Sequence, residues 1–574
     1  MRRVVTDLAA RALDDAAYDV VVVGSGVAGL TAALTASVEG LRVLVLEKEP
    51  LLGGTSALSG GTVWIPPREI QEEARDNPSS AMAYLCALIG DTAPNVLRQR
   101  FLECGQDALD YLGARADIQF VVRDHSPDYH PEIPGGSLGG RSHNPMAFDG
   151  RRLGKAGFKR LRPPMAAFTL LGGMMVDLQD VQHLLRAWRS PRSCAHGLTL
   201  LTRYLGDRLQ GFGRGTRLVL GNALVAQLLA ALDARAVPCV VNVRATDLVV
   251  ENGRVIGVEV VRDGKPQILR ATKGVVVASG GFPWSAPLRR RYSSMPATSF
   301  SVAAPGSNGE GIKMSLRAGA SVGAPQKEPA FWVPVSIDQR AGEREVRYPH
   351  FAWDRAKPGL IAVNRAGERF VNEACSYHEF VRAMSRPSAH VASRGAFLIC
   401  DSQFMRKWGL GLARPAGWPR RHLLRSGYLV KGDTLEKLAR SIGVDAAGLG
   451  RTVERINRFA LSGHDDDFGK GASAYNRHLG DPSHSPNPCV GQLRHAPFFA
   501  VQVHPGDIGT TIGVQTDVHA RAVNHAGEPI AGLYVVGNDM HSIMGGEYPG
   551  PGITLGPAVT FGWIAARHMA TALA

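Results

Sequence analysis

Cysteine is scarce in this 574-residue chain, and no two cysteines stand at a metal-binding spacing. There are seven of them, scattered along the sequence, with no CxxC or CxxCH pair. This pattern lacks the usual motifs for zinc, iron–sulfur clusters and c-type haem, so we expect no metal. An odd, dispersed set also favours reduced thiols inside a cell over a disulfide framework. The cysteines are Cys86, Cys104, Cys194, Cys239, Cys375, Cys400 and Cys489.

Long uncharged apolar runs are missing as well. No stretch approaches the roughly 18 residues that a helix needs to span a bilayer, so no membrane-spanning helix is expected. The opening residues, MRRVVTDLAARALDD, lack the apolar core of a signal peptide and are interrupted by aspartates. We therefore expect neither secretion nor import into an organelle, and a cytoplasmic location.

Charged residues are not abundant, but their balance is strongly basic. They make up 20% of the chain against 45% hydrophobic residues, which is typical of a globular protein and excludes disordered and fibrous classes. The net charge is +14. No RNA- or DNA-binding motif accompanies this excess, so nucleic acid is not an expected partner. An anionic membrane surface, or solubility alone, fits the charge better.

Residues 18–49 contain the most informative pattern. An apolar run at 20–23 predicts a buried parallel strand, followed at once by a GSGVAG turn and a helix-compatible Leu/Ala segment. Gly24 permits the tight turn, Gly26 lets the backbone approach a pyrophosphate, and Gly29 lets the helix pack closely on the strand. Phosphates are favoured at such a helix N-terminus by its dipole and its unpaired N–H groups.

A second predicted strand, 43–46, completes this dinucleotide-binding pattern. It ends in Glu47, at the distance from the glycines where an acceptor for the ribose hydroxyls is expected. With both strands, the helix and the terminal acid in register, the sequence predicts a Rossmann-like dinucleotide site.

Later glycine-rich segments are predicted to contact the same cofactor. They are LGGTSALSGG at 52–61, a strand-to-glycine junction at 279–281, and GLYVVGN at 532–538 followed by GGEYPGPG at 545–552. An enzyme that binds only a nicotinamide cofactor does not need C-terminal segments that return to the cofactor, so we predict FAD rather than NAD. The loop at 52–66 contains no histidine, so we expect FAD to be held non-covalently. The predicted FAD contacts are Gly24, Ser25, Gly26, Ala28, Gly29, Glu47, Lys48, Gly53, Gly54, Thr55, Ser56, Ser59, Gly60, Gly61, Ser279, Gly280, Gly281, Gly537, Asn538, Gly552 and Ile553.

The order of the predicted elements indicates an α/β protein, α+β overall. A Rossmann-like FAD-binding domain is interrupted by a second, substrate-capping catalytic domain. From about residue 285 the strand–helix alternation becomes less strict and aromatic residues, prolines and charges increase. We therefore predict an FAD-binding domain at 1–284, a catalytic domain at 285–505 and a return to the first domain at 506–574.

Three local elements of the first domain are also predicted. Apolar spacing predicts helices at 80–115 and at 216–232. The dipeptide Asn252-Gly253 predicts a β-hairpin with a type I′ turn.

The composition shifts between residues 151 and 217. Apolar stretches such as 166–176 alternate with arginines that far outnumber the aspartates. Aliphatic faces edged by arginine are what an interfacial helix needs. A helical insertion with a solvated basic face is an equally good interpretation.

The segment EYPGPGIT contains a candidate site for a carbonyl oxygen. Its two prolines have no N–H, which leaves the amides of Gly550, Gly552 and Ile553 as donors near a predicted helix start. The Gly552 amide and the Tyr548 hydroxyl could together stabilise a ketone oxygen that becomes enolate-like. A rigid proline turn that opens a helix is the simpler alternative, but it does not account for the tyrosine.

These motifs together resemble those of the fumarate reductase/succinate dehydrogenase flavoprotein superfamily, and within it the 3-ketosteroid Δ1-dehydrogenases. The resemblance covers most of the chain. It rests on VVVVGSGVAGLTAAL, GGTSALSGGTVWIP, PDYHPEIPGG, GERFVNE, PGDIGTTIGVQTD and, most specifically, GGEYPGPGITLGPAVTFGWIAARH. It implies an FAD domain interrupted by a catalytic domain, in agreement with the boundaries above.

The resemblance also implies roles for four residues. In that family a tyrosine and a glycine of the YPGPG motif bind the steroid C3 carbonyl, which correspond to Tyr548 and Gly552. The family's base is a tyrosine shortly after RFxNE, which corresponds to Tyr377, and a supporting tyrosine corresponds to Tyr129. The implied reaction is 1,2-desaturation, in which Tyr377 removes a C2 proton and the C1 hydrogen leaves as hydride to flavin N5. A quinone-type or artificial electron acceptor completes the cycle.

A tyrosine base needs help at neutral pH, because its ordinary pKa is about 10. We expect a hydrogen bond from Tyr129, together with the basic surroundings, to lower the pKa of Tyr377.

Other functions stay open at this point. A dicarboxylate reductase of the same superfamily would need clustered cations, whereas the tyrosines here suit a neutral ketone better. A 4-ene or 5α-specific ketosteroid dehydrogenase is a closer alternative. A non-catalytic flavin-binding membrane protein is the alternative from outside the enzymes.

Overall fold

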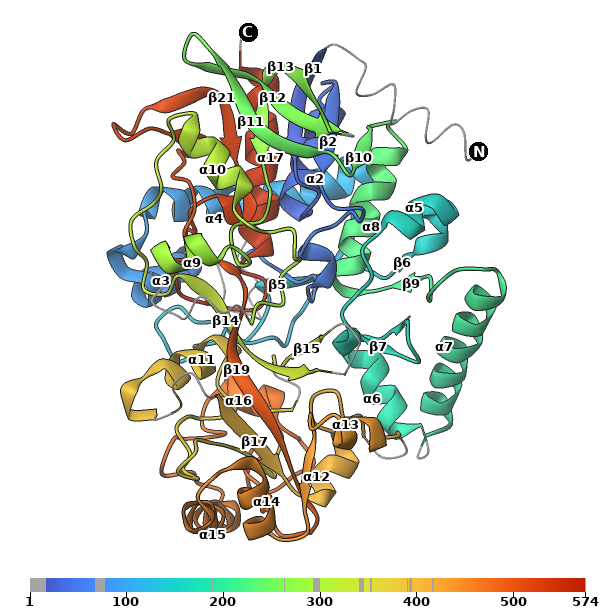
Figure 1. The fold of residues 1–574 in the computed structure, drawn as a ribbon, viewed down its shortest axis with the longest axis vertical. Coiled ribbons are helices and arrows are strands. Elements are labelled where there is room, and N and C mark those ends of the chain that lie inside the picture. The colour runs from blue at the N-terminus through green and yellow to red at the C-terminus, as the bar shows by residue number, and fades with distance from the viewer. Residues whose placement is uncertain are drawn as a thin grey trace.

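Two β-sheets organise the chain, one in the upper and one in the lower part of Figure 1. The N-terminal residues that bear on targeting lie outside the described part. This computed structural model describes residues 17–67, 78–187, 190–262, 264–292, 300–339, 345–351, 354–389, 391, 395–415 and 418–572.

The first sheet has eight strands in the order β10-β2-β1-β13-β12-β21-β20, with β11 paired to β12. Strands β10, β2, β1, β13 and β21 run parallel. All of β2 is buried, as is expected for a parallel strand covered on both faces. The strands are β1 (Ala17–Val23), β2 (Val43–Glu47), β10 (Cys239–Val241), β11 (Arg244–Glu251), β12 (Arg254–Arg262), β13 (Lys265–Val277), β20 (Arg521–Val523) and β21 (Pro529–Val535).

The helices beside the first sheet form one connected layer. The last helix, α17, packs against α2 and α4, and α2 packs against α8. Their bounds are α2 (Val27–Val38), α4 (Asn95–Ala116), α8 (Leu220–Asp233) and α17 (Leu555–Thr571). The predicted α/β class with a Rossmann-like start is confirmed by this arrangement.

Local predictions in this part were partly right. Asn252 and Gly253 have φ angles of 50° and 74°, so the predicted type I′ hairpin between β11 and β12 is confirmed. The helical prediction for 80–115 is confirmed over most of the range, which is divided into α3 (Pro78–Ile89), a short η2 (Gly90–Thr92) and α4. The break falls at Gly90, with φ +65°, and before Pro94, which holds the preceding residue extended.

One helix start differs from the sequence-based expectation, and the start of the closing helix α17 places Gly552. The helix predicted from residue 216 begins at Leu220, because β9 (Arg217–Leu218) pairs with β6 (Phe148–Asp149). The closing helix begins at Leu555, so Gly552 lies in the turn before it.

The second sheet has the order β15-β14-β19-β17-β16, with β18 paired to β19. Its strands are β14 (Ala330–Asp338), β15 (Val346–Pro349), β16 (Leu360–Val363), β17 (Ala396–Cys400), β18 (Val430–Gly432) and β19 (Phe498–Thr510). Alternate side chains of β16, β17 and β19 point to opposite faces, as strand geometry requires. One face packs against α11 (Tyr377–Ser385), the other against α14 (Leu435–Ile442) and α15 (Ala446–Ser462).

The insertion at 151–217 lies beside both sheets (Figure 1). Arg414 connects it to the second-sheet region by donating to the carbonyl oxygens of Ala166 and Thr169, at 2.7 and 3.0 Å. Its elements are η3 (Gly150–Leu153), α5 (Gly154–Arg160), η4 (Ala166–Phe168), β7 (Thr169–Leu170), β8 (Met174–Met175), α6 (Leu178–Arg186) and α7 (Pro191–Leu209). Among the residues described, no helix has the length and apolarity to cross a membrane.

Candidate active site

A cavity of about 1640 Å³ runs from the carboxyl end of β1 to α6, α11 and α12 (Ser402–Lys407). A site for one drug-sized ligand has about 300–1,000 Å³. The cavity therefore has room for a dinucleotide and a second ligand.

The inner end of the cavity is built by the GSGVAG turn and the start of α2. A Cβ atom at Gly24, where φ is +111°, would lie 2.2 Å from the carbonyl oxygen of Ala278, so this turn requires glycine. At Gly26 the nearest atom to an added Cβ would be Ser56 Oγ at 3.5 Å, which leaves space in front of the backbone. Gly26, the N-cap residue of α2, has no side chain to cover the helix start, where a ligand anion is favoured; the first helix amide, of Val27, donates to Ser56 Oγ at 3.0 Å. These features fit the pyrophosphate of FAD.

Carboxylates and donors gather where the adenosine part would lie. Glu47 is buried; its Oε2 accepts from Ser25 Oγ at 2.5 Å and its Oε1 from the amide of Glu49 at 3.0 Å. Lys48 pairs with Glu310 at 2.6 Å. Glu49 and Glu310 also line the cavity and were missed, since neither stands in a recognisable motif.

Asp539 organises the second glycine loop and was also missed. Its buried carboxylate accepts the amides of Ser279, Gly280 at 3.2 Å and Gly281 at 3.0 Å. Three donors on one carboxylate fix the backbone of the loop. These partners lie about 260 residues apart in sequence, so no local pattern announces the contact.

Most of the predicted FAD contacts line this cavity. They are Gly24, Ser25, Gly26, Ala28, Glu47, Lys48, Gly54, Thr55, Ser56, Ser59, Gly60, Gly61, Ser279, Gly280, Gly537, Asn538 and Gly552.

Gly29, Gly53, Gly281 and Ile553 are not among the cavity-lining residues described. Gly29 packs α2 onto the sheet, because a Cβ there would lie 2.2 Å from the Gly24 carbonyl oxygen. Gly53 donates its amide to Ser25 Oγ at 3.0 Å, and Ile553 lines a small neighbouring cavity. Gly281 has its amide bound to Asp539.

Four tyrosines meet in the wall of this cavity. The ring centroids of Tyr129, Tyr377 and Tyr548 lie 5.0–5.5 Å from one another. Tyr475, on α16 (Ala474–Leu479), lies 4.8 Å from Tyr129. All four line the cavity and all four are buried. Tyr475 was missed because it lies in a polar segment with no motif.

Tyr377 is positioned by the start of α11. Ser376 caps this helix by accepting the amide of Glu379 at 3.2 Å, which makes Tyr377 its first residue. Phe380 and Met384 anchor the helix in the core of the second sheet. Tyr377 therefore belongs structurally to the second-sheet region.

Tyr129 and Tyr548 are positioned by loops that bond to each other. The Tyr129 amide donates to the carbonyl oxygen of Pro549 at 2.8 Å, and the Tyr84 hydroxyl donates to the same oxygen at 2.7 Å. Asp128 anchors the Tyr129 loop by accepting from Arg141 and from the indole of Trp64, both at 2.8 Å.

Gly552 lines the same cavity as Tyr548. Its φ is +104°, and a Cβ there would lie 2.6 Å from the carbonyl oxygen of Thr62, so the position requires glycine. Its carbonyl oxygen accepts from the amides of Trp64 and Gly556. Its own amide has no hydrogen-bond partner within the described part of the chain.

The tyrosine pKa values differ from our expectation. Burial, the largest cause, raises the pKa of Tyr377 well above its ordinary value, and the neighbouring phenols of Tyr129 and Tyr548 raise it further. The expectation that Tyr129 lowers the pKa of Tyr377 is therefore wrong for the protein without substrate. Burial also raises the pKa of Tyr129, and that of Tyr548 to about 12.

A cation that the sequence does not single out faces this tyrosine group. Arg123 lines the cavity, lowers the pKa of Tyr129 by its charge, and has no ion-pair partner in the ranges that the structure describes. It lies on a short irregular segment after β4 (Phe120–Val122), where the sequence gives no functional signal.

The fold and the cavity define a flavoprotein of the FAD binding domain family, whose family model matches residues 19–555. The chain is 39% identical to the 3-oxosteroid 1-dehydrogenase of Mycolicibacterium smegmatis, over 97% of this chain and 98% of that protein. It is 37% identical to the 4-oxocyclohex-2-ene-1-carboxylate 5-dehydrogenase of Sinomonas cyclohexanicum, over 96% of this chain and 94% of that protein.

A crystal structure of the 3-ketosteroid Δ1-dehydrogenase from Sterolibacterium denitrificans with 1,4-androstadiene-3,17-dione matches this fold. Its TM-score is 0.89 at 37% identity, covering 97% of this chain and 100% of that one. The chain belongs to the 3-ketosteroid Δ1-dehydrogenase family of the fumarate reductase/succinate dehydrogenase superfamily. Its cofactor is FAD.

Proposed function

We propose that this protein is an FAD-dependent 3-oxosteroid 1-dehydrogenase that introduces a C1–C2 double bond into 3-oxo-4-ene steroids. The observation that supports it most is the convergence of Tyr377, Tyr548 and the Gly552 amide on one cavity that continues into the dinucleotide cradle. Two of the three proteins compared above are named for this activity.

The ketone would be held by Tyr548 and Gly552. The Tyr548 hydroxyl and the Gly552 amide both donate, so both stabilise an oxygen that gains negative charge. This polarisation acidifies the C2–H of the steroid. Aromatic side chains surround this part of the cavity, and the ring centroid of Phe351 lies 5.2 Å from that of Tyr377. These side chains exclude water and suit a neutral substrate ring.

Tyr377 would remove the C2 proton, and Tyr129 would support it. The phenol of Tyr377 has those of Tyr129 and Tyr548 as hydrogen-bonding neighbours. FAD, when bound, supplies the acceptor for the hydride that leaves C1. We propose that a quinone-type acceptor, or an artificial one in an assay, takes up the two electrons.

A raised tyrosine pKa predicts a pH profile. The base acts only without its proton, so log kcat/KM should rise with pH from neutral towards the alkaline range. The Arg123→Gln variant removes the cation that lowers the pKa of Tyr129. The phenols of Tyr129 and Tyr377 are hydrogen-bonding neighbours and titrate as a pair, so loss of this cation should move the rising limb to higher pH. A limb that moves by about one pH unit lowers kcat/KM at neutral pH about tenfold.

The control for Arg123 is Arg406→Gln, which removes another cavity-lining arginine, on α12, and should leave the limb in place. A profile that coincides with the wild-type one in Arg123→Gln would contradict this role of Arg123.

The cavity beyond the tyrosines favours a steroid over a single ring. Phe168, Val181, Leu184, Trp408 and Leu410 line it, so apolar wall continues well past the ketone end. Product analysis with androst-4-ene-3,17-dione tests the function: a 1,4-diene is expected. Recovery of unchanged steroid with a purified yellow protein would contradict it.

A cyclic keto acid is the second candidate. The guanidinium of Arg123 could face a carboxylate, and one of the relatives is named for such a substrate. In the same assay, 4-oxocyclohexanecarboxylate should be turned over far more slowly than the steroid. Desaturation of a 5α-steroid at C4–C5 instead would indicate the 4-ene/5α-specific alternative.

We further propose peripheral contact between segment 151–217 and the inner face of the cell membrane. Leu198, Leu205 and Leu209 of α7 are 56%, 51% and 89% exposed, next to the exposed Arg208. Leu185 of α6 both lines the cavity and reaches solvent, so a sterol could pass from lipid to cavity at this point.

Replacing Leu205 and Leu209 together by glutamate should abolish co-sedimentation with anionic liposomes at low salt. The matched control is Leu461→Glu on α15, where the side chain is 68% exposed and far from the segment. Equal sedimentation of all three proteins would contradict the proposal, as would failure of the wild type to bind.

The presence of two separate sheets supports different functions for the two predicted domains. We propose that residues 1–284 and 506–574 hold FAD and that residues 285–505 close over it and supply Tyr377.

A further inference from the structure

An ion-pair network connects the helix of Tyr377 to the loop of Tyr548. Arg382, near the end of α11, donates to Glu547 at 3.0 Å, to Glu379 at 2.8 Å and to Glu328 at 3.1 Å. Glu547 also pairs with Lys327 at 3.2 Å. The carboxylate of Glu547 is only 5% exposed, so it depends on these two cations.

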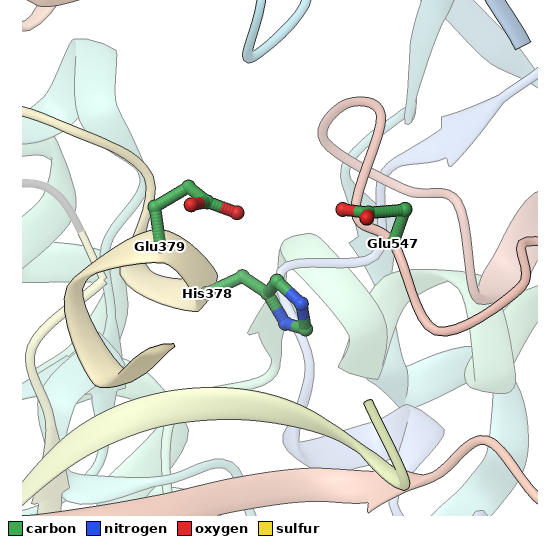
Figure 2. A group of neighbouring side chains, drawn as sticks. All are labelled: His378, Glu379 and Glu547. Carbon is green, nitrogen blue, oxygen red and sulfur yellow. The ribbon is translucent and has the colours of Figure 1, made fainter. Parts of the chain in front are cut away.

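The same place contains a group of residues that could suggest a metal. Figure 2 shows His378 and Glu379 on α11 with Glu547 on the facing loop, and their ligand atoms lie within 4.8 Å of one another. However, Nδ1 of His378 already accepts the amide of Trp332 at 3.2 Å. The guanidinium of Arg382 bonds both carboxylates, so the chain itself supplies the cation that this group needs.

The network lies close to the two phenols along the chain. Tyr377 and Arg382 lie on the same helix, one near each end, and Glu547 directly precedes Tyr548. The Arg382–Glu547 pair therefore crosses from the second-sheet region to the C-terminal loop within a few residues of both phenols. A shift of this pair would change the distance between the proton acceptor and the ketone donor.

The loop has little freedom to compensate by itself. Gly546 packs closely against the segment that precedes β14. A Cβ atom at Gly546 would lie 2.3 Å from the backbone nitrogen of Glu328. The Lys327 amide donates to the Gly545 carbonyl oxygen at 3.1 Å. The loop therefore packs against residues 327–328. Arg382 bonds Glu547 in the loop and Glu328 in the segment against which the loop packs.

We propose that Arg382 is a positioning residue, which sets the separation between the phenols of Tyr377 and Tyr548 by bonding Glu547 across the two halves of the site. This inference rests on the proposed function. An arginine suits the task, because its fork reaches three carboxylates with fixed geometry, whereas a lysine offers a point charge.

The test compares Arg382→Gln, Arg382→Lys and Glu547→Gln with the wild type in 1-dehydrogenation. Misplacement of reacting groups by about 1 Å can cost on the order of 100-fold, so we expect kcat of Arg382→Gln to fall about 10–100-fold. KM for the steroid and flavin content should stay close to wild type, and Arg382→Lys should recover part of the loss.

Deuterium substitution identifies the affected step. With steroid deuterated at C2, the isotope effect on flavin reduction should grow in Arg382→Gln, because proton removal becomes slower. With steroid deuterated at C1, the isotope effect should not grow. Glu547→Gln should reproduce both isotope effects. Because this substitution removes a charge but keeps the size of the side chain, it replaces Arg382→Gln as the test if that variant does not fold.

The matched control is Arg567→Gln, which breaks the Arg567–Glu39 pair between α17 and the end of α2. It should keep wild-type kcat and isotope effects. Wild-type kcat in both Arg382→Gln and Glu547→Gln, or a higher KM with kcat retained, would overturn the inference. An inactive wild type would instead refute the proposed function.

Discussion

Tyr377→Phe is expected to lower kcat by about 10²–10⁴-fold, the usual contribution of a positioned acid–base group, while FAD stays bound. The ring fills the same space among Tyr129, Tyr548 and Phe351, so the packing of the site should survive. Only the proton acceptor for C2 is lost. Steady-state turnover of androst-4-ene-3,17-dione and the visible spectrum of the purified variant measure both parts of this prediction.

The matched control is Tyr475→Phe. Tyr475 is also buried, also lines the cavity and lies 4.8 Å from Tyr129, yet no role in proton removal is proposed for it. Its variant should keep most of the activity. Turnover of Tyr377→Phe equal to that of Tyr475→Phe would show that Tyr377 is not the base.

Tyr548→Phe has the second-largest expected effect. Removing one donor from a two-donor carbonyl site costs about 10²–10³-fold in kcat, because the stabilisation is greatest when the oxygen is most negative. The ring would still pack against Phe331 at 5.5 Å, so the loop should keep its place. The affinity for the 1,4-diene product should fall in parallel. The change that the product causes in the flavin spectrum measures this affinity.

Tyr534→Phe is the control for this variant. Tyr534 lies on β21, and its hydroxyl is hydrogen-bonded to His568 of α17 at 2.7 Å. Neither residue is among those that line the cavity, so activity should not change. Gly552→Ala is a poorer test of the same site, because the new Cβ would meet backbone at 2.6 Å and disturb the loop as well. Full activity in Tyr548→Phe would contradict the two-donor arrangement.

The FAD site could be predicted because its signals are local. One apolar run, three glycines and Glu47 fall within 30 residues, and each has a known mechanical task. The contacts of Asp539 and Arg123 could not be predicted, because they depend on how distant segments meet. Asp539 looks like any polar residue after a strand until the fold brings the 279–281 loop to it.

The wrong expectation about Tyr377 has a clear physical cause. The sequence indicates which polar groups surround a residue of a known family, but it does not give the depth at which the residue is buried. Burial is the largest cause of the raised pKa of Tyr377, and the neighbouring phenols raise it further instead of lowering it. Similarly, the break in the helix at Gly90 depends on one positive φ angle that apolar spacing alone does not reveal.

Anaerobic reduction of the bound flavin tests the central claim most directly. Androst-4-ene-3,17-dione, mixed with the purified holoenzyme without an acceptor, should bleach the absorbance at about 450 nm and yield one 1,4-diene for each flavin reduced. Flavin that stays oxidised with this steroid would contradict the account, as would bleaching by 4-oxocyclohexanecarboxylate alone.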